Sequence, residues 1–134
     1  ICQERGIPML CANPDFQATQ PDGSVGYMPG IVAEFYESIG GKVLHFGKPF
    51  KPAFNACIGL LTGVPHDRIC HVGDSLHHDI KGANDAGIDS LFITTGIHKD
   101  GLPSSTDPEY SNAVRSLCSN IGARPTFVAQ DFVW

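Results

Sequence analysis

The sequence lacks any run of about 18 apolar residues, the length that spans a bilayer, so it predicts no membrane-spanning helix. Clusters of Lys and Arg are missing as well, and nine basic against fourteen acidic side chains give a formal net charge of −5. Binding to nucleic acid needs clustered basic residues, so we expect neither a nucleic-acid nor a membrane partner. A small phosphorylated substrate stays open, because it needs only one or two placed cations or a metal ion.

The sequence has few cysteines, five in 134 residues, and no two of them form a C-x-x-C motif. An odd number without such a pair argues against a disulfide framework or a zinc knuckle. We therefore expect free thiols, a reducing compartment and a cytoplasmic protein. The first residue is Ile1 instead of Met, so we also expect that residues precede it in the natural protein.

Short apolar runs alternate with segments of helical periodicity. The runs that predict strands cover 7–12, 43–46, 68–72, 90–94 and 126–129. The segments that predict helices are 29–39, 52–61, 79–86 and one capped by Asp107, and 17–26 predicts a loop or hairpin. Strands separated by helices of about ten residues imply parallel pairing through right-handed crossovers. The predicted class is α/β.

Burial can be predicted for two of these segments. The run 68–72 has too few polar positions for a half-exposed strand, so we expect burial on both of its faces. In the helix after residue 51, four apolar residues at helical spacing predict a core-facing stripe: Phe54, Cys57, Ile58 and Leu61. Gly63 and Gly87 stand where left-handed helix ends are expected.

Two polar clusters directly follow predicted strands. Gly47-Lys48-Pro49 comes after Phe46, and Gly73-Asp74 comes after Val72, with Asp79 five residues further on. Ligands of open parallel sheets bind outside the carboxyl ends of the strands. Two carboxylates and one ammonium at this edge could hold a hard cation beside a phosphate, and Mg²⁺ prefers such oxygen donors.

Simpler interpretations exist for each part. Asp79 alone would be a helix cap, Gly47-Lys48-Pro49 alone a turn, and Thr94-Thr95-Gly96 after a strand also a turn. His45 and His71 fit packed or turn-bonded positions better than catalytic ones. A zinc site is an alternative to magnesium, although oxygen donors favour magnesium; its ligands would be Asp74, His77, His78 and Asp79.

The segment 71–88 resembles the fourth motif of the haloacid dehalogenase (HAD) superfamily, and 47–49 resembles its third motif. Residues 11–15 and 29–30 are similar to the end of the large α/β cap of one subclass, which includes nitrophenylphosphatase, phosphoglycolate and pyridoxal phosphate phosphatases. The resemblance implies a parallel Rossmann-like HAD sheet, here the second half of the core, with a remnant of the α/β cap. Residues 1–43 would be cap and 44–134 catalytic core.

The resemblance also implies roles. Lys48 would be catalytic, neutralising charge between the phosphoryl group and the nucleophile. Asp74 would bind Mg²⁺ directly. Asp79 would support that site, either as a second metal ligand or by bonding to a residue or water that is itself a ligand. Further candidates for substrate binding are Ser75, through a hydrogen bond in the site, and Asn13 or Asp15, from the cap side.

The chain departs from the superfamily in one respect: its nucleophile motif, D-x-D, occurs nowhere in the sequence. Three explanations are open: the chain is the C-terminal piece of a longer phosphatase, a natural remnant that binds without turnover, or one of two chains that form the enzyme together. We expect a piece of a Mg²⁺-dependent phosphatase that is inactive alone and leaves an unpaired strand edge at Val72. Its partners would be a small phosphorylated metabolite, the missing N-terminal half and a second copy in a homodimer. The alternative is a non-catalytic binding or assembly module.

Overall fold

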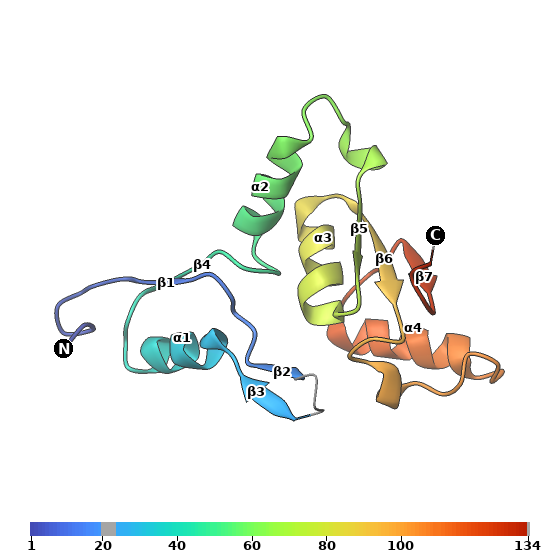
Figure 1. Cartoon of the computed structure of the whole chain (residues 1–134), viewed down its shortest axis with the longest axis horizontal. Coiled ribbons are helices and arrows are strands. Elements are labelled where there is room, and N and C mark those ends of the chain that lie inside the picture. The colour runs from blue at the N-terminus through green and yellow to red at the C-terminus, as the bar shows by residue number, and fades with distance from the viewer. Residues whose placement is uncertain (20–23, 134) are drawn as a thin grey trace. The chain divides into compact units, whose positions relative to one another are not determined.

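The computed structural model describes residues 1–19 and 24–133, and it divides into two compact units, Ile1–Ala53 and Phe54–Trp134 (Figure 1). Each unit has its own sheet and its own buried side chains. Within the described residues, no helix is long and apolar enough to cross a membrane.

The first unit combines a parallel strand pair, a hairpin and one helix. Strand β1 (Met9–Cys11) pairs in parallel with β4 (Val43–His45). The predicted loop or hairpin is an antiparallel hairpin of β2 (Gln17–Thr19) and β3 (Val25–Tyr27), and positions 20–23 of that segment lie outside the described residues. Helix α1 (Pro29–Ser38) begins at the predicted Pro29, whose fixed φ suits a first helical position.

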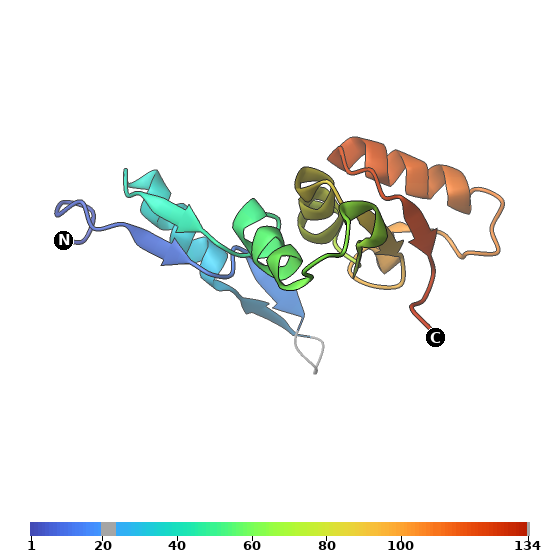
Figure 2. The same ribbon diagram turned by 90° about the horizontal axis from the view of Figure 1, so that it is seen from above.

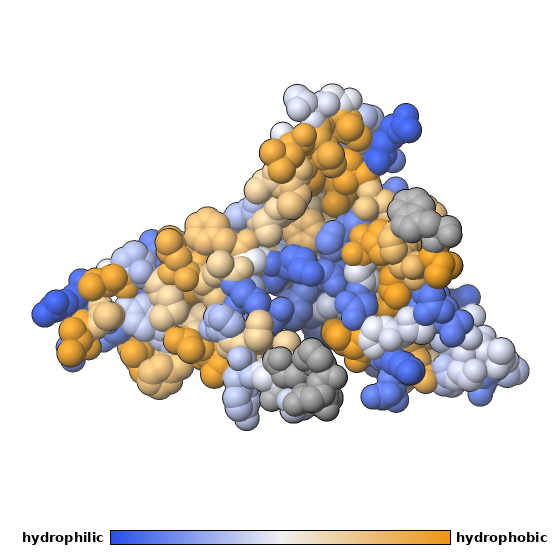
Figure 3. Space-filling model, viewed as in Figure 1, coloured by the Kyte–Doolittle hydropathy of each residue, from blue (hydrophilic) through white to orange (hydrophobic). Residues whose placement is uncertain are grey.

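The buried face of α1 differs from a simple apolar stripe. Ala33 and Tyr36 are buried, and the Tyr36 hydroxyl donates a hydrogen bond to the Ile7 carbonyl. Val32 and Phe35 are 57% and 63% exposed, and Figure 3 shows apolar side chains at the surface of α1. The helix therefore presents apolar side chains to solvent as well as to its own strands.

Helix α2 (Lys51–Leu60) follows β4, and only part of its predicted stripe is buried. Phe54 is buried and Ile58 is partly buried beside it, whereas Cys57 and Leu61 are exposed. The prediction of a fully buried stripe is wrong, because the described residues supply packing partners only for Phe54 and its neighbour. Gly63 has the expected left-handed backbone, with φ of +80°.

The second unit contains a three-stranded parallel sheet in the order β5-β6-β7. Parallel pairing confirms the predicted α/β class. The predicted helix from Asp79 begins earlier, as a π-helical segment η2 that runs directly into α3, so Asp79 lies inside the first turns and not at their start. The elements are η1 (His66–Arg68), β5 (Cys70–Gly73), η2 (Leu76–Ile80), α3 (Lys81–Ala86), β6 (Asp89–Ile93), η3 (Lys99–Gly101), α4 (Tyr110–Ile121) and β7 (Phe127–Ala129).

One face of this sheet carries the main core. Phe92 of β6 is fully buried against Leu76 and Ile80 of η2 and against Val114 and Cys118 of α4. Figure 2 shows α3 and α4 on the same side of the sheet. A second cluster of Phe54, Ala83 and Ile88 joins α2 to α3. These contacts fix the segment that follows β5.

On the opposite face of the sheet, side chains of the two outer strands, β5 and β7, are exposed. Val72, Leu91 and Phe127 stand in register across the three strands, and Val72 is 36% and Phe127 55% exposed. The prediction that 68–72 is buried on both faces is wrong. In the described part of the chain, β5 pairs only with β6, and its Cys70 and Val72 side chains are exposed.

Thiol reactivity provides a test of this packing. All five cysteines are free; Cys2, Cys57 and Cys70 are exposed, and Cys11 and Cys118 are buried. Burial raises the pKa of Cys118, and burial with the nearby Asp89 carboxylate raises the pKa of Cys70, so both hold less reactive thiolate at a given pH. With a chromogenic disulfide at pH 8, we expect fast reaction at Cys2 and Cys57, slower reaction at Cys70, and reaction at the two buried thiols only in urea. Equal rates at Cys2 and Cys118 would contradict the packing of α4.

Candidate functional site

The loop between β5 and η2 is closed by its own hydrogen bonds. Ser75 has an extended backbone at the helix N-cap, and its hydroxyl accepts a bond from the His78 N–H at 3.2 Å. The Ser75 N–H donates in turn to Oδ2 of Asp79 at 3.0 Å. This reciprocal pattern satisfies amide groups at the helix start and turns the Asp79 carboxylate back towards the end of β5.

Asp79 is held through both of its oxygens. It is 3% exposed, and its Oδ1 lies 3.1 Å from Nε2 of His71, which donates from the neighbouring strand. The His71 ring also meets Phe54 edge-on, with ring centres 5.1 Å apart. His71 is therefore packed, as expected from the sequence. Its hydrogen bond to Asp79 was not predicted. Asp79 is placed to brace the loop that carries Asp74.

Asp74 is half-buried at the carboxyl end of β5, and the segment after β6 holds it from the side. Its Oδ2 accepts a hydrogen bond from the Ile97 N–H at 2.9 Å. Gly96 leaves the space for this contact, since a Cβ atom there would overlap the Asp74 side chain. No residue in the described ranges bonds Oδ1 of Asp74, so one carboxylate oxygen is fixed and the other is open.

This donor set fits a magnesium ion better than a zinc ion. Mg²⁺ is usually bound by one or two carboxylates, with waters and substrate oxygens completing its shell, and an anchored carboxylate with one open oxygen is such a ligand. Across 1–19 and 24–133, no three side chains of His, Cys, Asp or Glu converge on a common point. The zinc alternative of Asp74, His77, His78 and Asp79 therefore has no support in the geometry.

The first unit contains a second group of predicted residues. Asn13, Asp15 and Lys48 line one pocket of about 430 Å³. The Asn13 side chain accepts a hydrogen bond from the Asp15 N–H at 3.0 Å, which fixes the turn after β1. Gly47 brings the Lys48 loop against that turn, because a Cβ at Gly47 would overlap Pro14. An exposed cation, an amide and a carboxylate thus share a polar pocket.

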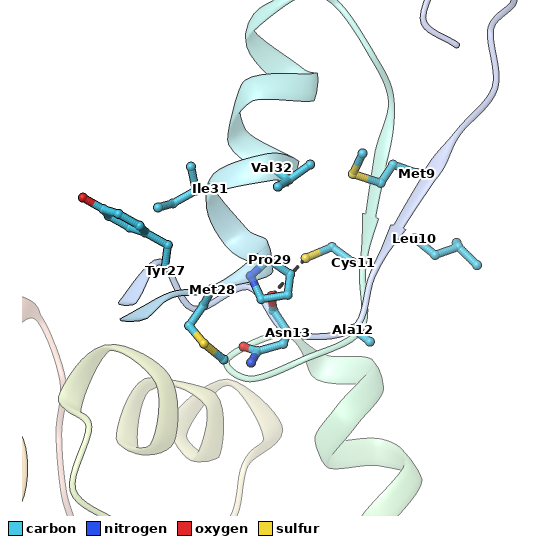
Figure 4. A pocket seen from close by; sticks show the side chains of 10 residues that line it. All are labelled: Met9, Leu10, Cys11, Ala12, Asn13, Tyr27, Met28, Pro29, Ile31 and Val32. Carbon is cyan, nitrogen blue, oxygen red and sulfur yellow. Dashed lines mark hydrogen bonds between the residues drawn. The ribbon is translucent and has the colours of Figure 1, made fainter. Parts of the chain in front are cut away.

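A larger groove of about 910 Å³ lies on the same unit between β1, β3 and α1 (Figure 4). Its walls are apolar, with Met9 facing Val32 across it, and none of its lining residues is charged. Asn13 lies at one end, where its carbonyl accepts a weak bond from the Cys11 thiol at 3.2 Å. The groove has no charged side chain to bind a phosphoryl group, so the smaller pocket that contains Lys48 is the better candidate site.

The six predicted site residues fall into two groups. In the second unit, Asp74 and Ser75 lie in the loop after β5 and Asp79 lies in η2, bonded to that loop; the other three line the pocket of the first unit. The Ser75 hydroxyl acts as a helix cap, and its contact with a substrate stays a prediction. The expected approach of Lys48 to Asp74 and Asp79 also stays a prediction, because Lys48 belongs to the first unit and the two acids belong to the second.

The sequence matches the HAD-hydrolase-like family over residues 45–133, which is more than half of the chain. The chain belongs to the HAD-hydrolase-like family. Among curated proteins, it is 23% identical over 95 residues to dihydroxyacetone phosphatase from Corynebacterium glutamicum (strain R), covering 71% of this chain and 34% of that protein. The resemblance suggested by segments 47–49 and 71–88 is thereby confirmed at the level of the family.

Solved structures of HAD-family proteins have the same fold. A hydrolase of the haloacid dehalogenase-like family from Brucella suis 1330 superposes with a TM-score of 0.73 and 28% identity, over 98% of this chain and 46% of that one. A glycerol phosphate phosphatase from Mycobacterium tuberculosis, in complex with magnesium, gives a TM-score of 0.65 and 25% identity, over 95% and 34%. The chain therefore spans between about a third and a half of the length of these relatives.

Two residues that follow β6 were missed in the sequence: Ile97, whose N–H bonds Asp74, and His98, which bonds the Leu76 N–H. Gly96, named from the sequence only as part of a turn, lies against the Asp74 side chain. The available signal was strand adjacency: consecutive parallel strands end at one edge, so the residues after β6 meet those after β5. The assignment of 1–43 to cap and 44–134 to core stays a prediction; the structural division falls after Ala53.

Proposed function

We propose that this chain is part of a magnesium-dependent phosphomonoesterase that acts through an aspartyl-phosphate intermediate. An aspartate carboxylate attacks the phosphorus and the bond to the substrate oxygen breaks, releasing an alcohol. Water then cleaves the acyl phosphate, giving inorganic phosphate and the free carboxylate. The attacking aspartate would belong to residues outside this sequence, which contains no D-x-D.

The anchored carboxylate of Asp74 is the observation that carries this proposal. Its Oδ2 is fixed by the Ile97 N–H, which leaves Oδ1 as a preorganised ligand at the carboxyl end of β5. A bound Mg²⁺ would supply electrostatic stabilisation of the charge on the phosphoryl oxygens. Asp79 would hold the loop through Ser75 and His71, which keeps the first carboxylate in place.

The polar pocket of the first unit supports a phosphorylated substrate. Lys48 would donate to a phosphoryl oxygen, and its positive charge would lower the repulsion between that group and the carboxylate nucleophile. Asn13 and Asp15, on the same pocket, would contact the organic part of the substrate. We propose a small phosphorylated metabolite as substrate, in keeping with the phosphatases among the relatives.

The remainder of the enzyme would complete the second unit. The open row of Val72, Leu91 and Phe127, together with the edge of β5 that no strand of the described residues covers, offers an apolar surface for another strand and a covering helix. The coverage of 34% to 46% of the relatives' length agrees with a missing portion. A cytoplasmic location remains part of the proposal; the free thiols are consistent with a reducing compartment.

The purified chain of 134 residues is expected to show no turnover of p-nitrophenyl phosphate with Mg²⁺ above the buffer rate, because its sequence contains no D-x-D motif. The longer protein encoded by the complete transcript should be active under the same conditions and lose activity with EDTA. Robust turnover by the short chain that vanished in Lys48→Ala would show that it contains a nucleophile that we have not identified.

A non-catalytic binding module is the second candidate, favoured by the absence of D-x-D. Sequencing the transcript upstream of the codon for Ile1 distinguishes the two. An apolar strand followed by D-x-D there supports the enzyme. An upstream sequence without that motif, combined with an inactive longer protein, would support the binding module.

A further inference from the structure

The segment that follows β6 clamps the loop that carries Asp74 at two points. The Ile97 N–H donates to the Asp74 carboxylate at 2.9 Å. One residue further on, Nε2 of His98 accepts a hydrogen bond from the Leu76 N–H at 3.3 Å. The two bonds bracket the turn Asp74-Ser75-Leu76, so its conformation depends on where residues 97 and 98 lie.

The His98 ring is fixed on two sides. Its edge packs on Phe92 of β6, with ring centres 5.8 Å apart and planes at 69°, and Phe92 is fully buried. Because Nε2 accepts a bond, the ring proton must be on Nδ1, and the ring is neutral. Burial lowers the pKa of His98, as does His77, while Asp74 acts in the opposite direction, and a lowered pKa agrees with the neutral ring that the bond requires.

The Leu76 N–H needs this acceptor. Leu76 is fully buried at the first position of η2, where an amide has no partner within its own helix. The Ser75 hydroxyl is engaged by the His78 N–H, so the first amide of the turn depends on His98. An unsatisfied N–H at this position would favour opening of the turn.

We infer that His98 is a positioning residue for Asp74: by accepting the Leu76 N–H, it holds the turn in which the Asp74 carboxylate meets the Ile97 N–H. The effect on metal binding rests on the proposed function, whereas the clamp itself does not. A residue that served only as packing on Phe92 would be replaced without loss by any side chain of similar volume. If His98 acts as the acceptor of the Leu76 N–H, a side chain of similar volume without an acceptor atom cannot replace it.

Three variants of the chain separate these roles. His98→Leu keeps much of the volume and removes the acceptor, and His98→Gln restores an acceptor near the position of Nε2. His66→Leu makes the first substitution at an exposed histidine of η1 and serves as the control. Two quantities are measured on ¹⁵N-labelled protein: amide hydrogen exchange at Leu76 and Ile97, and the Kd for MgCl₂ from amide shifts near Asp74.

We expect His98→Leu to accelerate exchange at both amides by about tenfold and to weaken Mg²⁺ binding by a similar factor, as for the loss of one hydrogen bond. His98→Gln should stay within about twofold of the wild type in both, and His66→Leu should change neither. Unchanged exchange in His98→Leu would overturn the inference, and so would equal acceleration in the Leu and Gln variants.

Two further readouts keep the test decisive. If the wild-type chain shows no Mg²⁺-dependent shift at Asp74, the metal site of the proposed function is wrong, and the exchange rates alone decide the role of His98. If His98→Leu does not fold, long-range ¹H–¹⁵N spectra of the wild type decide it: the inference requires a protonated Nδ1, and a protonated Nε2 would overturn it.

Discussion

Asp74→Asn is expected to lower the kcat of the longer phosphatase by about 10²–10³-fold. The substitution preserves the shape of the side chain, and the Asn carbonyl oxygen can still accept the Ile97 N–H that fixes Asp74. What it removes is the negative charge that would bind Mg²⁺. The loss should therefore appear in kcat and in the Mg²⁺ concentration needed for activity, with little change in thermal stability.

The matched control is Asp85→Asn, the same change at an exposed carboxylate on α3. It should leave both parameters unchanged, because an exposed side chain of α3 has no place in the loop that holds Asp74. Full kcat in Asp74→Asn would remove Asp74 from the catalytic machinery and, with it, the main support for the proposed function.

Gly30→Ala should destabilise the chain by about 2–3 kcal/mol, as an overpacked buried site. Gly30 is buried in the first turn of α1, and its N–H donates to the Asp15 carbonyl at 3.0 Å. A Cβ atom there would overlap the carbonyl oxygens of Pro14 and Asp15, which are rigid backbone atoms. The turn Asn13-Pro14-Asp15 would have to move, so the pocket of Lys48 should be lost as well.

Gly59→Ala is the same substitution at another site, and we expect it to change the stability in the opposite direction. Gly59 lies within α2, and a Cβ atom there would meet no atom within 4 Å. Alanine should therefore stabilise the helix by about 0.5–1 kcal/mol. Urea unfolding at constant m-value measures both effects. Equal stability of the two variants would mean that α1 does not approach the turn after β1 as described.

The order of strands and helices could be predicted because local signals determine it. Apolar runs, Pro29 at the start of α1 and Gly87 at the end of α3 are readable without knowledge of tertiary contacts. Burial was less predictable. Val72, in an apolar run, and Phe35, in the predicted helix 29–39, are both exposed, because burial depends on which other segments cover a given face.

The sequence allowed us to predict which residues belong to the candidate site, but not the hydrogen bonds that hold them. Motif spacing identified Asp74 and Asp79, and the structure shows that Asp79 bonds the His71 ring and the N–H of Ser75, the residue after Asp74. The partners Ile97 and His98 are 23 and 22 residues away from Asp74 and Leu76 in sequence, and only the pairing of β5 with β6 makes them neighbours. No local pattern predicts a bond from a backbone N–H to a distant carboxylate.

The strand order β5-β6-β7 follows the order along the chain, and this has a consequence for folding. Each new strand joins the one made just before it, so the sheet can grow strand by strand along the chain. Each parallel pair still needs a crossover connection before its strands can meet, which makes this pairing slower than that of a hairpin. Until something covers Val72 and Phe127, the nascent sheet would be a natural client for a chaperone.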